Sequence, residues 1–136
     1  MQNSSADRIR RMCYRMSGHA FAMTLMNVPI LELAITKDRV GEIMHPSFVP
    51  TPAQLAFAHL MGEFAASHSG VSSEIEPCGP TPDLAPVESL RNDVLEAAQK
   101  AMGAVSRIAE TLLEQETISM DQFYLILDQE LARRPS

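Results

Sequence analysis

The stretch YRMSGHA at residues 14–20 lies in the segment that sets the fold of the chain. Around it, apolar residues recur every three or four positions, which is the spacing of an amphipathic helix. Asn27 tolerates a left-handed backbone and Pro29 cannot continue a helical hydrogen-bond ladder, so we predict a helix over residues 6–27. The apolar positions of this helix are Ile9, Met12, Cys13, Met16, Ala20, Met23 and Met26.

The period of the apolar residues changes directly after this helix. Leu31, Leu33 and Ile35 alternate with other residues, as in a strand that is buried on one face. A charged turn follows, and residues 40–44 can return as a second strand. We therefore predict a β-hairpin over residues 30–45.

A helix-start signal follows the hairpin. Thr51 can cap a helix, Pro52 suits its first turn, and Gln54 can reach back to complete a capping box. These residues predict a helix over residues 52–67. Residues 68–82 are rich in Gly, Ser and Pro, and we interpret them as a linker.

The last part of the chain has a long apolar stripe of helical spacing, with Gly103 as its expected bend. Ser119 and Gln122 form a second capping box, so we predict C-terminal helices over residues 85–132. The fold class is therefore mainly α, an α+β domain with one small hairpin after the first helix. The inner face of the last helix is predicted to be Phe123, Leu127 and Leu131.

Composition excludes several classes of protein. The 136 residues suit a single domain, and their net charge of −6 offers no basic surface for nucleic-acid phosphates. Residues 21–36 are mostly apolar but contain Pro29 and Glu32, so we predict a core segment and no membrane partner. Cys13 and Cys78 match no disulfide framework, which favours the reducing cytoplasm.

Gly18 beside His19 in mid-helix is unusual, because glycine costs about 1 kcal/mol there. In a zinc peptidase helix of the form His-Glu-x-x-His, both histidines face one metal and the glutamate polarises its water. In the same frame, Arg15 stands at the first ligand and Met16 at the general base, with Ser17 between them and Gly18. The spacing of the motif is therefore kept, but its first metal ligand and its general base are replaced.

In this frame the segment resembles the zinc helix of the peptidase domain of FtsH-type ATP-dependent zinc proteases, which reads His-Glu-Ala-Gly-His. Residues 27–36 and 40–46 are similar to the hairpin that follows this helix in the family. LMGEFAA at residues 60–66 resembles the family's Leu-Ala-Gly-x-Ala-Ala-Glu helix, with Ala66 in place of the final glutamate.

Two later segments extend the resemblance. GPTPDL at residues 79–84 is similar to the place where the family supplies an aspartate as third zinc ligand, a position that Asp83 matches. AETLLEQETI at residues 109–118, followed by DQF at 121–123, resembles the family's Leu-Leu-Glu-x-Glu-Thr pattern, a connector and a last helix. The likeness thus spans about residues 8–127 in the family's order.

The resemblance implies a pseudo-enzyme with no catalytic residue, because Met16 replaces a base that contributes about 100-fold to 10,000-fold in rate. Neither a metal nor another cofactor is expected. His19 and Asp83 would be vestigial ligands, with Arg15 in place of the first one. The sequence has no Gly-x-x-x-x-Gly-Lys-Ser/Thr motif, so we do not expect an ATP-driven protease.

Arg15, Asp83 and His19 each have two interpretations. The guanidinium of Arg15 could pair with Asp83 and keep a cation at the old metal position. Alternatively, Arg15 lies on a solvated face and Asp83 caps the following helix. His19 is either a remaining ligand or a hydrogen-bonded, half-buried histidine, and Cys13 is predicted to be a small core residue.

We interpret the chain as a protein that binds a protein or peptide partner, with the edge of the hairpin as the candidate binding surface. One alternative is a small soluble zinc metallopeptidase with a rebuilt site. In it, His19 would be joined by zinc donors drawn from His45, His59, His68 and Cys78. Another alternative is an unrelated helical protein-interaction module, and self-association into a homo-oligomer stays open.

Overall fold

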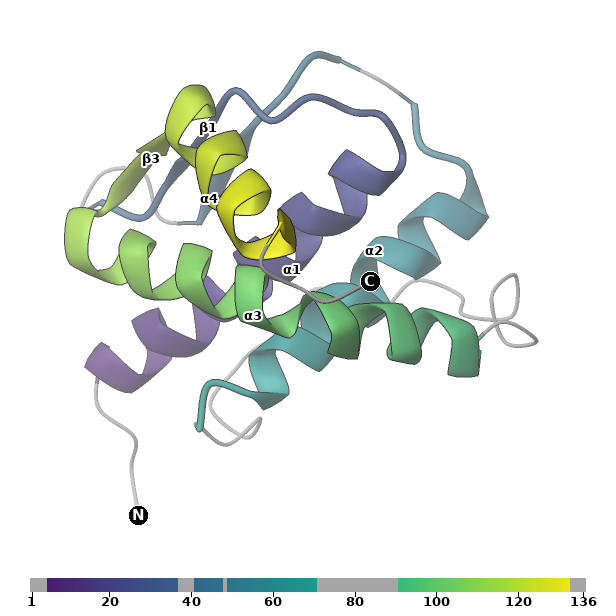
Figure 1. Cartoon of the computed structure of the whole chain (residues 1–136), viewed down its shortest axis with the longest axis horizontal. Coiled ribbons are helices and arrows are strands. Elements are labelled where there is room, and N and C mark those ends of the chain that lie inside the picture. The colour runs from purple at the N-terminus through teal and green to yellow at the C-terminus, as the bar shows by residue number, and fades with distance from the viewer. Residues whose placement is uncertain (1–4, 37–40, 48, 71–90, 133–136) are drawn as a thin grey trace.

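The computed structural model describes residues 5–36, 41–47, 49–70 and 91–132. In these ranges it contains helices and a small antiparallel sheet (Figure 1), which confirms the predicted mainly helical α+β class. The elements follow one another as α1 (Ser5–Leu25), β1 (Glu32–Ala34), β2 (Glu42–Met44), α2 (Pro52–Ser67), α3 (Arg91–Gln115), β3 (Thr117–Ser119) and α4 (Met120–Ala132).

The end of α1 confirms the predicted stop signal. Asn27 has a φ of 64°, in the left-handed region that asparagine tolerates. The backbone N–H of Val28 then donates to the carbonyl of Met23 at 2.9 Å, which satisfies an acceptor in the last turn. The chain leaves the helix here and turns towards β1.

The start of α2 is the predicted capping box. The Gln54 N–H donates to Oγ1 of Thr51 at 3.1 Å, and the Thr51 N–H donates to Oε1 of Gln54 at 2.9 Å. Both bonds are local in sequence, so the helix begins at the predicted residue, Pro52. At the start of α4, the Gln122 N–H donates to Oγ of Ser119 at 3.3 Å, which confirms one half of the predicted box. The side-chain amide of Gln122 donates to Oε1 of Gln115 at 2.9 Å.

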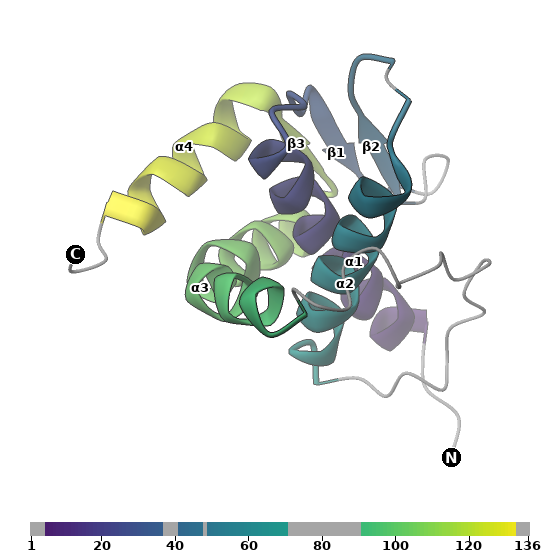
Figure 2. The same ribbon diagram turned by 90° about the vertical axis from the view of Figure 1, so that its right-hand side faces the viewer.

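The sheet has a strand that the sequence did not predict. Its order is β2-β1-β3, and β3 lies in the segment that we interpreted as a connector. Ile118 is fully buried and pairs with Leu33 across β1 and β3. A strand of three residues is too short to show an alternating pattern, so only its pairing with β1 identifies it. Figure 2 shows the three strands side by side.

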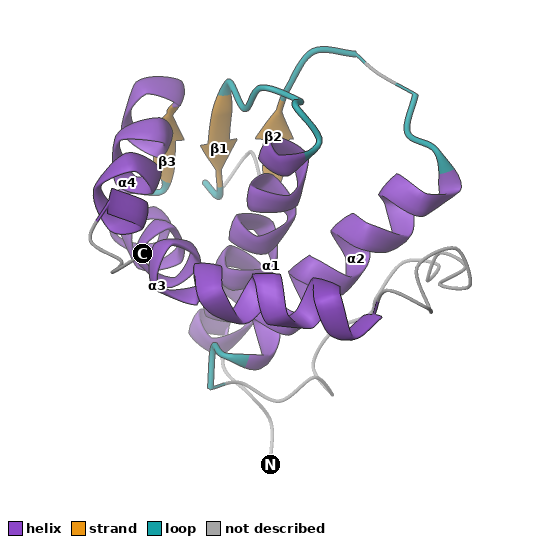
Figure 3. Cartoon of the chain, turned by 45° about the vertical axis from the view of Figure 1, so that its right-hand side comes forward, coloured by secondary structure: helices purple, strands orange, loops and turns teal. Residues whose placement is uncertain are grey.

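The core lies where α1 packs on α2, α3 and the sheet (Figure 3). Most of the predicted apolar face of α1 is buried or packs against this core, but Ile9 in the second turn is 42% exposed and is a correction. The third helix continues through Gly103 without interruption. No helix in the described ranges is long and apolar enough to cross a bilayer. The largest fully buried side chains are Phe123, Ile30, Leu33, Met61, Ile108, Leu112 and Ile118.

Candidate functional site

The motif residues of α1 lie against α2, and two glycines let the helices approach closely. A Cβ atom at Gly18 would lie 2.5 Å from the backbone oxygen of Met61 and 2.8 Å from Cβ of Ala65. A Cβ atom at Gly62 would lie 2.6 Å from Nε2 of His19. The imidazole of His19 therefore rests directly on the backbone of α2, in space that any other residue at position 62 would fill.

Arg15 forms an ion pair with Glu63 of α2, through Nη2 and Oε2. The two side chains are 21% and 34% exposed, so the pair is partly removed from water. Of the two interpretations of Arg15, the solvated face is therefore wrong. In the other interpretation Arg15 pairs with Asp83, which lies outside the described residues. Glu63 lies within the LMGEFAA stretch, but no spacing in the sequence predicts that it pairs with Arg15.

Met16, which the resemblance aligns with the general base of a zinc peptidase, is 5% exposed. It belongs to the main core, together with Cys13 one turn earlier on α1. A thioether accepts no proton from water at neutral pH, and this one is packed among apolar side chains. Met16 is thus part of the packing of the domain.

The pKa of His19 is lowered to about 4, chiefly by burial and also by the positive charge of Arg15 and by the neighbouring His59. Glu63 acts in the opposite direction. The imidazole is therefore neutral in the folded protein at pH 7. The side chain is partly accessible to solvent, which confirms the half-buried part of the prediction, whereas its hydrogen bond stays a prediction.

The lowered pKa of His19 predicts a loss of stability in weak acid. The unfolded chain, with the ordinary histidine pKa of 6.5, binds a proton between pH 6.5 and about 4, whereas the folded chain does not. The contribution of His19 is therefore complete above pH 6.5 and falls as the pH drops towards 4. We expect His19→Gln to flatten the dependence of the free energy of unfolding on pH in this window.

Urea unfolding at pH 7 and pH 4.5 measures this effect as the difference between wild type and variant. His45→Gln is the matched control, because His45 is exposed and its removal deletes an imidazole without changing the α1/α2 contact. An equal flattening in both variants would contradict the assignment to His19.

The other candidate ligands do not gather around His19, with one exception. His59 of α2 is close enough to influence its pKa. His45 is exposed, with Nδ1 2.8 Å from the carbonyl oxygen of Pro46, and His68 is exposed at the end of α2. Cys78 lies outside the described residues. Within the ranges that are described, no group of three or more His, Cys, Asp or Glu could hold a metal ion.

Cys13 is a core residue, as predicted. It is fully buried, and burial raises the pKa of its thiol to about 12, with the charge of Glu110 acting in the same direction. A thiol with so high a pKa has almost no thiolate at pH 7 and is a poor nucleophile.

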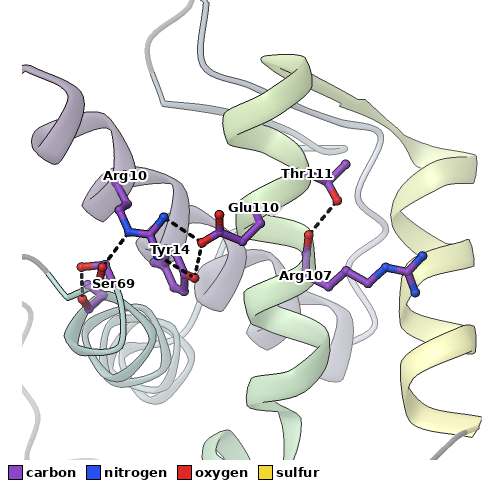
Figure 4. Close-up of polar contacts among 7 residues, drawn as sticks. Arg10, Tyr14, Ser69, Arg107, Glu110 and Thr111 are labelled. Atoms are coloured by element: carbon purple, nitrogen blue, oxygen red, sulfur yellow. Dashed lines mark hydrogen bonds and ion pairs between the residues drawn. The ribbon is translucent and has the colours of Figure 1, made fainter.

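A polar cluster that the sequence did not reveal joins α1 to α3 and to the turn that follows α2 (Figure 4). Arg10 donates through Nε to the Ser69 carbonyl at 2.7 Å and pairs through Nη1 with Oε2 of Glu110 at 2.8 Å. The Tyr14 hydroxyl donates to the same carboxylate oxygen at 2.5 Å. Burial, together with this hydrogen bond, raises the pKa of Tyr14. Its contacts indicate that the cluster holds the helices that carry the motif.

Two surface features lie away from the motif. A pocket of about 350 Å³ is lined by residues at the end of α1 and on α4, and none of the motif residues contributes to it. The second feature is the outer edge of β2, because β2 has only β1 beside it in the described part of the sheet. The pocket is lined by Thr24, Asn27, Val28, Pro29 and Tyr124.

Comparison with known proteins assigns no family to the chain. No protein-family model matches the chain, and no curated protein matches it.

Proposed function

We propose that the chain is a non-catalytic relative of the FtsH-type peptidase domain and acts by binding a protein. The proposal takes up the resemblance of the sequence and is supported by the order of α1, the β1–β2 hairpin and α2, which is the order that the resemblance implies. Fold alone does not define a function, so the argument depends on the motif residues themselves.

The observation that carries the non-catalytic part is what occupies positions 15 and 16. Arg15 brings a permanent positive charge to the position that the resemblance gives to a metal ligand, and its ion pair with Glu63 takes up a carboxylate that lies near His19. Met16 fills the position of the base with a buried apolar side chain. A dication at His19 would therefore meet a cation at close range and no positioned base.

The binding part of the proposal is supported by the outer edge of β2. An open strand edge presents backbone N–H and C=O groups that can pair with an extended segment of another protein. Glu42 and Met44 are exposed on this strand, and the residues that follow it, 45–47, are exposed as well. We infer a cytoplasmic protein partner, because the two cysteines match no disulfide framework and a net charge of −6 does not favour binding to nucleic-acid phosphates.

The rebuilt zinc peptidase is the competing function, and the proximity of His59 to His19 is the one observation in its favour. Metal analysis of the purified protein, combined with a peptide-hydrolysis assay, separates the two. We expect less than about one zinc per ten chains after dialysis against micromolar zinc, and no cleavage that a chelator suppresses. Zinc at one ion per chain together with chelator-sensitive cleavage would overturn the proposal.

A further inference from the structure

The hydrogen bonds between β1 and β3 determine which way the backbone N–H and C=O groups of β2 point. The N–H of Ile35 donates to the carbonyl of Glu116 at 2.8 Å, at the end of the β1–β3 pair. Bonding direction alternates along an antiparallel strand, so residues 33 and 35 face β3, whereas residues 32 and 34 face β2. The hydrogen-bonded pairs between β1 and β2 are therefore Glu32 with Met44 and Ala34 with Glu42.

Ile43 lies between these two pairs, opposite Leu33 in a pair that is not hydrogen-bonded. Its N–H and C=O consequently point away from β1, towards the outer edge of β2. The N–H of Leu31, one residue before β1, also donates to the Met44 carbonyl at 2.8 Å, so the alternation is interrupted just before the strand begins. This bond nevertheless places the Met44 C=O on the β1 side of β2, as the pairing of Glu32 with Met44 requires. Ile43 is thus the residue whose backbone would pair with an added strand.

The side chains beside this edge have a defined chemistry. Glu42 and Met44 project to the same face of β2, opposite the face that carries Ile43. Both are exposed, Met44 at 43%. Glu32 projects to that face from β1, opposite Met44. An added strand would therefore place its own side chains beside one carboxylate and one thioether, with a second carboxylate one strand further in.

Charge decides which occupant suits this edge. A second copy of the chain, paired through Ile43, would bring its own Glu42 into the diagonal position on the same face, about 7–8 Å away. Each copy also carries a net charge of −6, so the approach of two copies is repulsive. A basic segment meets neither obstacle, and a lysine or arginine opposite Glu42 gains a cross-strand ion pair.

We propose that the outer edge of β2 binds an extended peptide in the antiparallel direction, with an apolar residue opposite Met44 and a basic residue opposite Glu42. The peptide backbone pairs with the N–H and C=O of Ile43. Reading the peptide from its N-terminus, the pattern is apolar, any residue, basic. This inference rests on the protein-binding part of the proposed function and adds the chemistry of the ligand.

The first test removes the backbone donor. A fluorescent nine-residue peptide rich in threonine and valine, with Leu-Val-Lys at its centre, is titrated with the full chain by anisotropy. Ile43→Pro deletes the N–H that faces the edge, without removing a bond to β1, and we expect it to weaken binding at least about tenfold. Ile43→Ala truncates the same side chain but keeps the N–H, and we expect a change below about threefold.

The second test exchanges charge across the edge. Glu42→Lys is expected to weaken binding of the lysine peptide about threefold to fivefold and to strengthen binding of a peptide with glutamate in place of that lysine. Glu114→Lys is the matched control, because Glu114 is exposed on α3 and its replacement changes the net charge equally. We expect this control to leave the preference between the peptides unchanged.

Each other outcome counts against a defined part of the inference. Equal binding by Ile43→Pro and Ile43→Ala, with equal circular dichroism spectra, would remove the edge of β2 as the binding surface. Equal affinity for the lysine and glutamate peptides would overturn the basic ligand. A wild-type dimer that Ile43→Pro dissociates in sedimentation would assign the edge to a second copy. Only zinc-dependent peptide cleavage would overturn the non-catalytic function itself.

Discussion

Gly18→Ala is expected to lower the free energy of unfolding by about 2–3 kcal/mol, although alanine is the better helix former by about 1 kcal/mol. The new Cβ atom would lie 2.5 Å from the backbone oxygen of Met61 and 2.8 Å from Cβ of Ala65. A backbone oxygen within a helix cannot rotate away from the added methyl group. The helices α1 and α2 must separate instead, which opens the contact that holds His19 and the Arg15–Glu63 pair.

Gly103→Ala is the matched control for this prediction. Gly103 is exposed on α3, and a Cβ atom there would meet no atom within 4 Å. Only helix propensity applies, so we expect this variant to gain about 0.5–1 kcal/mol. Urea unfolding of both variants measures the two effects, which should have opposite sign. Stabilisation by both substitutions would mean that α1 and α2 do not approach as closely as described.

The parts of the fold that the sequence predicts are those whose signals are local. The start of α2 depends on Thr51 and Gln54, which bond to each other across three residues, and the end of α1 depends on Asn27. The strand β3 depends instead on its pairing with β1, more than eighty residues earlier. No pattern within Thr117–Ser119 could have revealed that partner.

The candidate site follows the same division between local and distant signals. The frame of Arg15, Met16 and His19 is visible because all three lie within two turns of one helix. The partner of Arg15 is not visible, because Glu63 becomes its neighbour only when α2 packs on α1. Likewise, Arg11 looks like a surface residue in the sequence. It is buried at 3% exposure because its guanidinium donates to the Ala66 carbonyl at 3.1 Å.

Arg15→His is expected to create a site that binds about one zinc ion per chain at micromolar concentration. The new histidine would lie four residues before His19, so both imidazoles project from one face of α1. The substitution also removes the cation beside His19, which raises the affinity of the site for a dication. The resemblance implies that Asp83 is the third ligand.

Binding is measured by calorimetry with zinc, and geometry by the absorption of the cobalt-substituted protein, which distinguishes tetrahedral from octahedral coordination. Arg15→Gln is the matched control, because it removes the same cation without adding a donor, and we expect no zinc. Adding His19→Ala to Arg15→His should abolish the gained site. We expect no peptide hydrolysis by this variant, because a buried Met16 still stands where the resemblance aligns the base.

The identity of the third ligand tests the resemblance itself. If the chain retains the scaffold of a zinc peptidase, adding Asp83→Ala to Arg15→His should weaken zinc binding by at least about tenfold, whereas adding Glu63→Gln should change it little. The opposite result is also chemically reasonable, since Arg15→His releases Glu63 from its ion pair and leaves a carboxylate beside His19. A site built from Glu63 would be a new one between α1 and α2, and the relationship to the peptidase family would then have lost its main support.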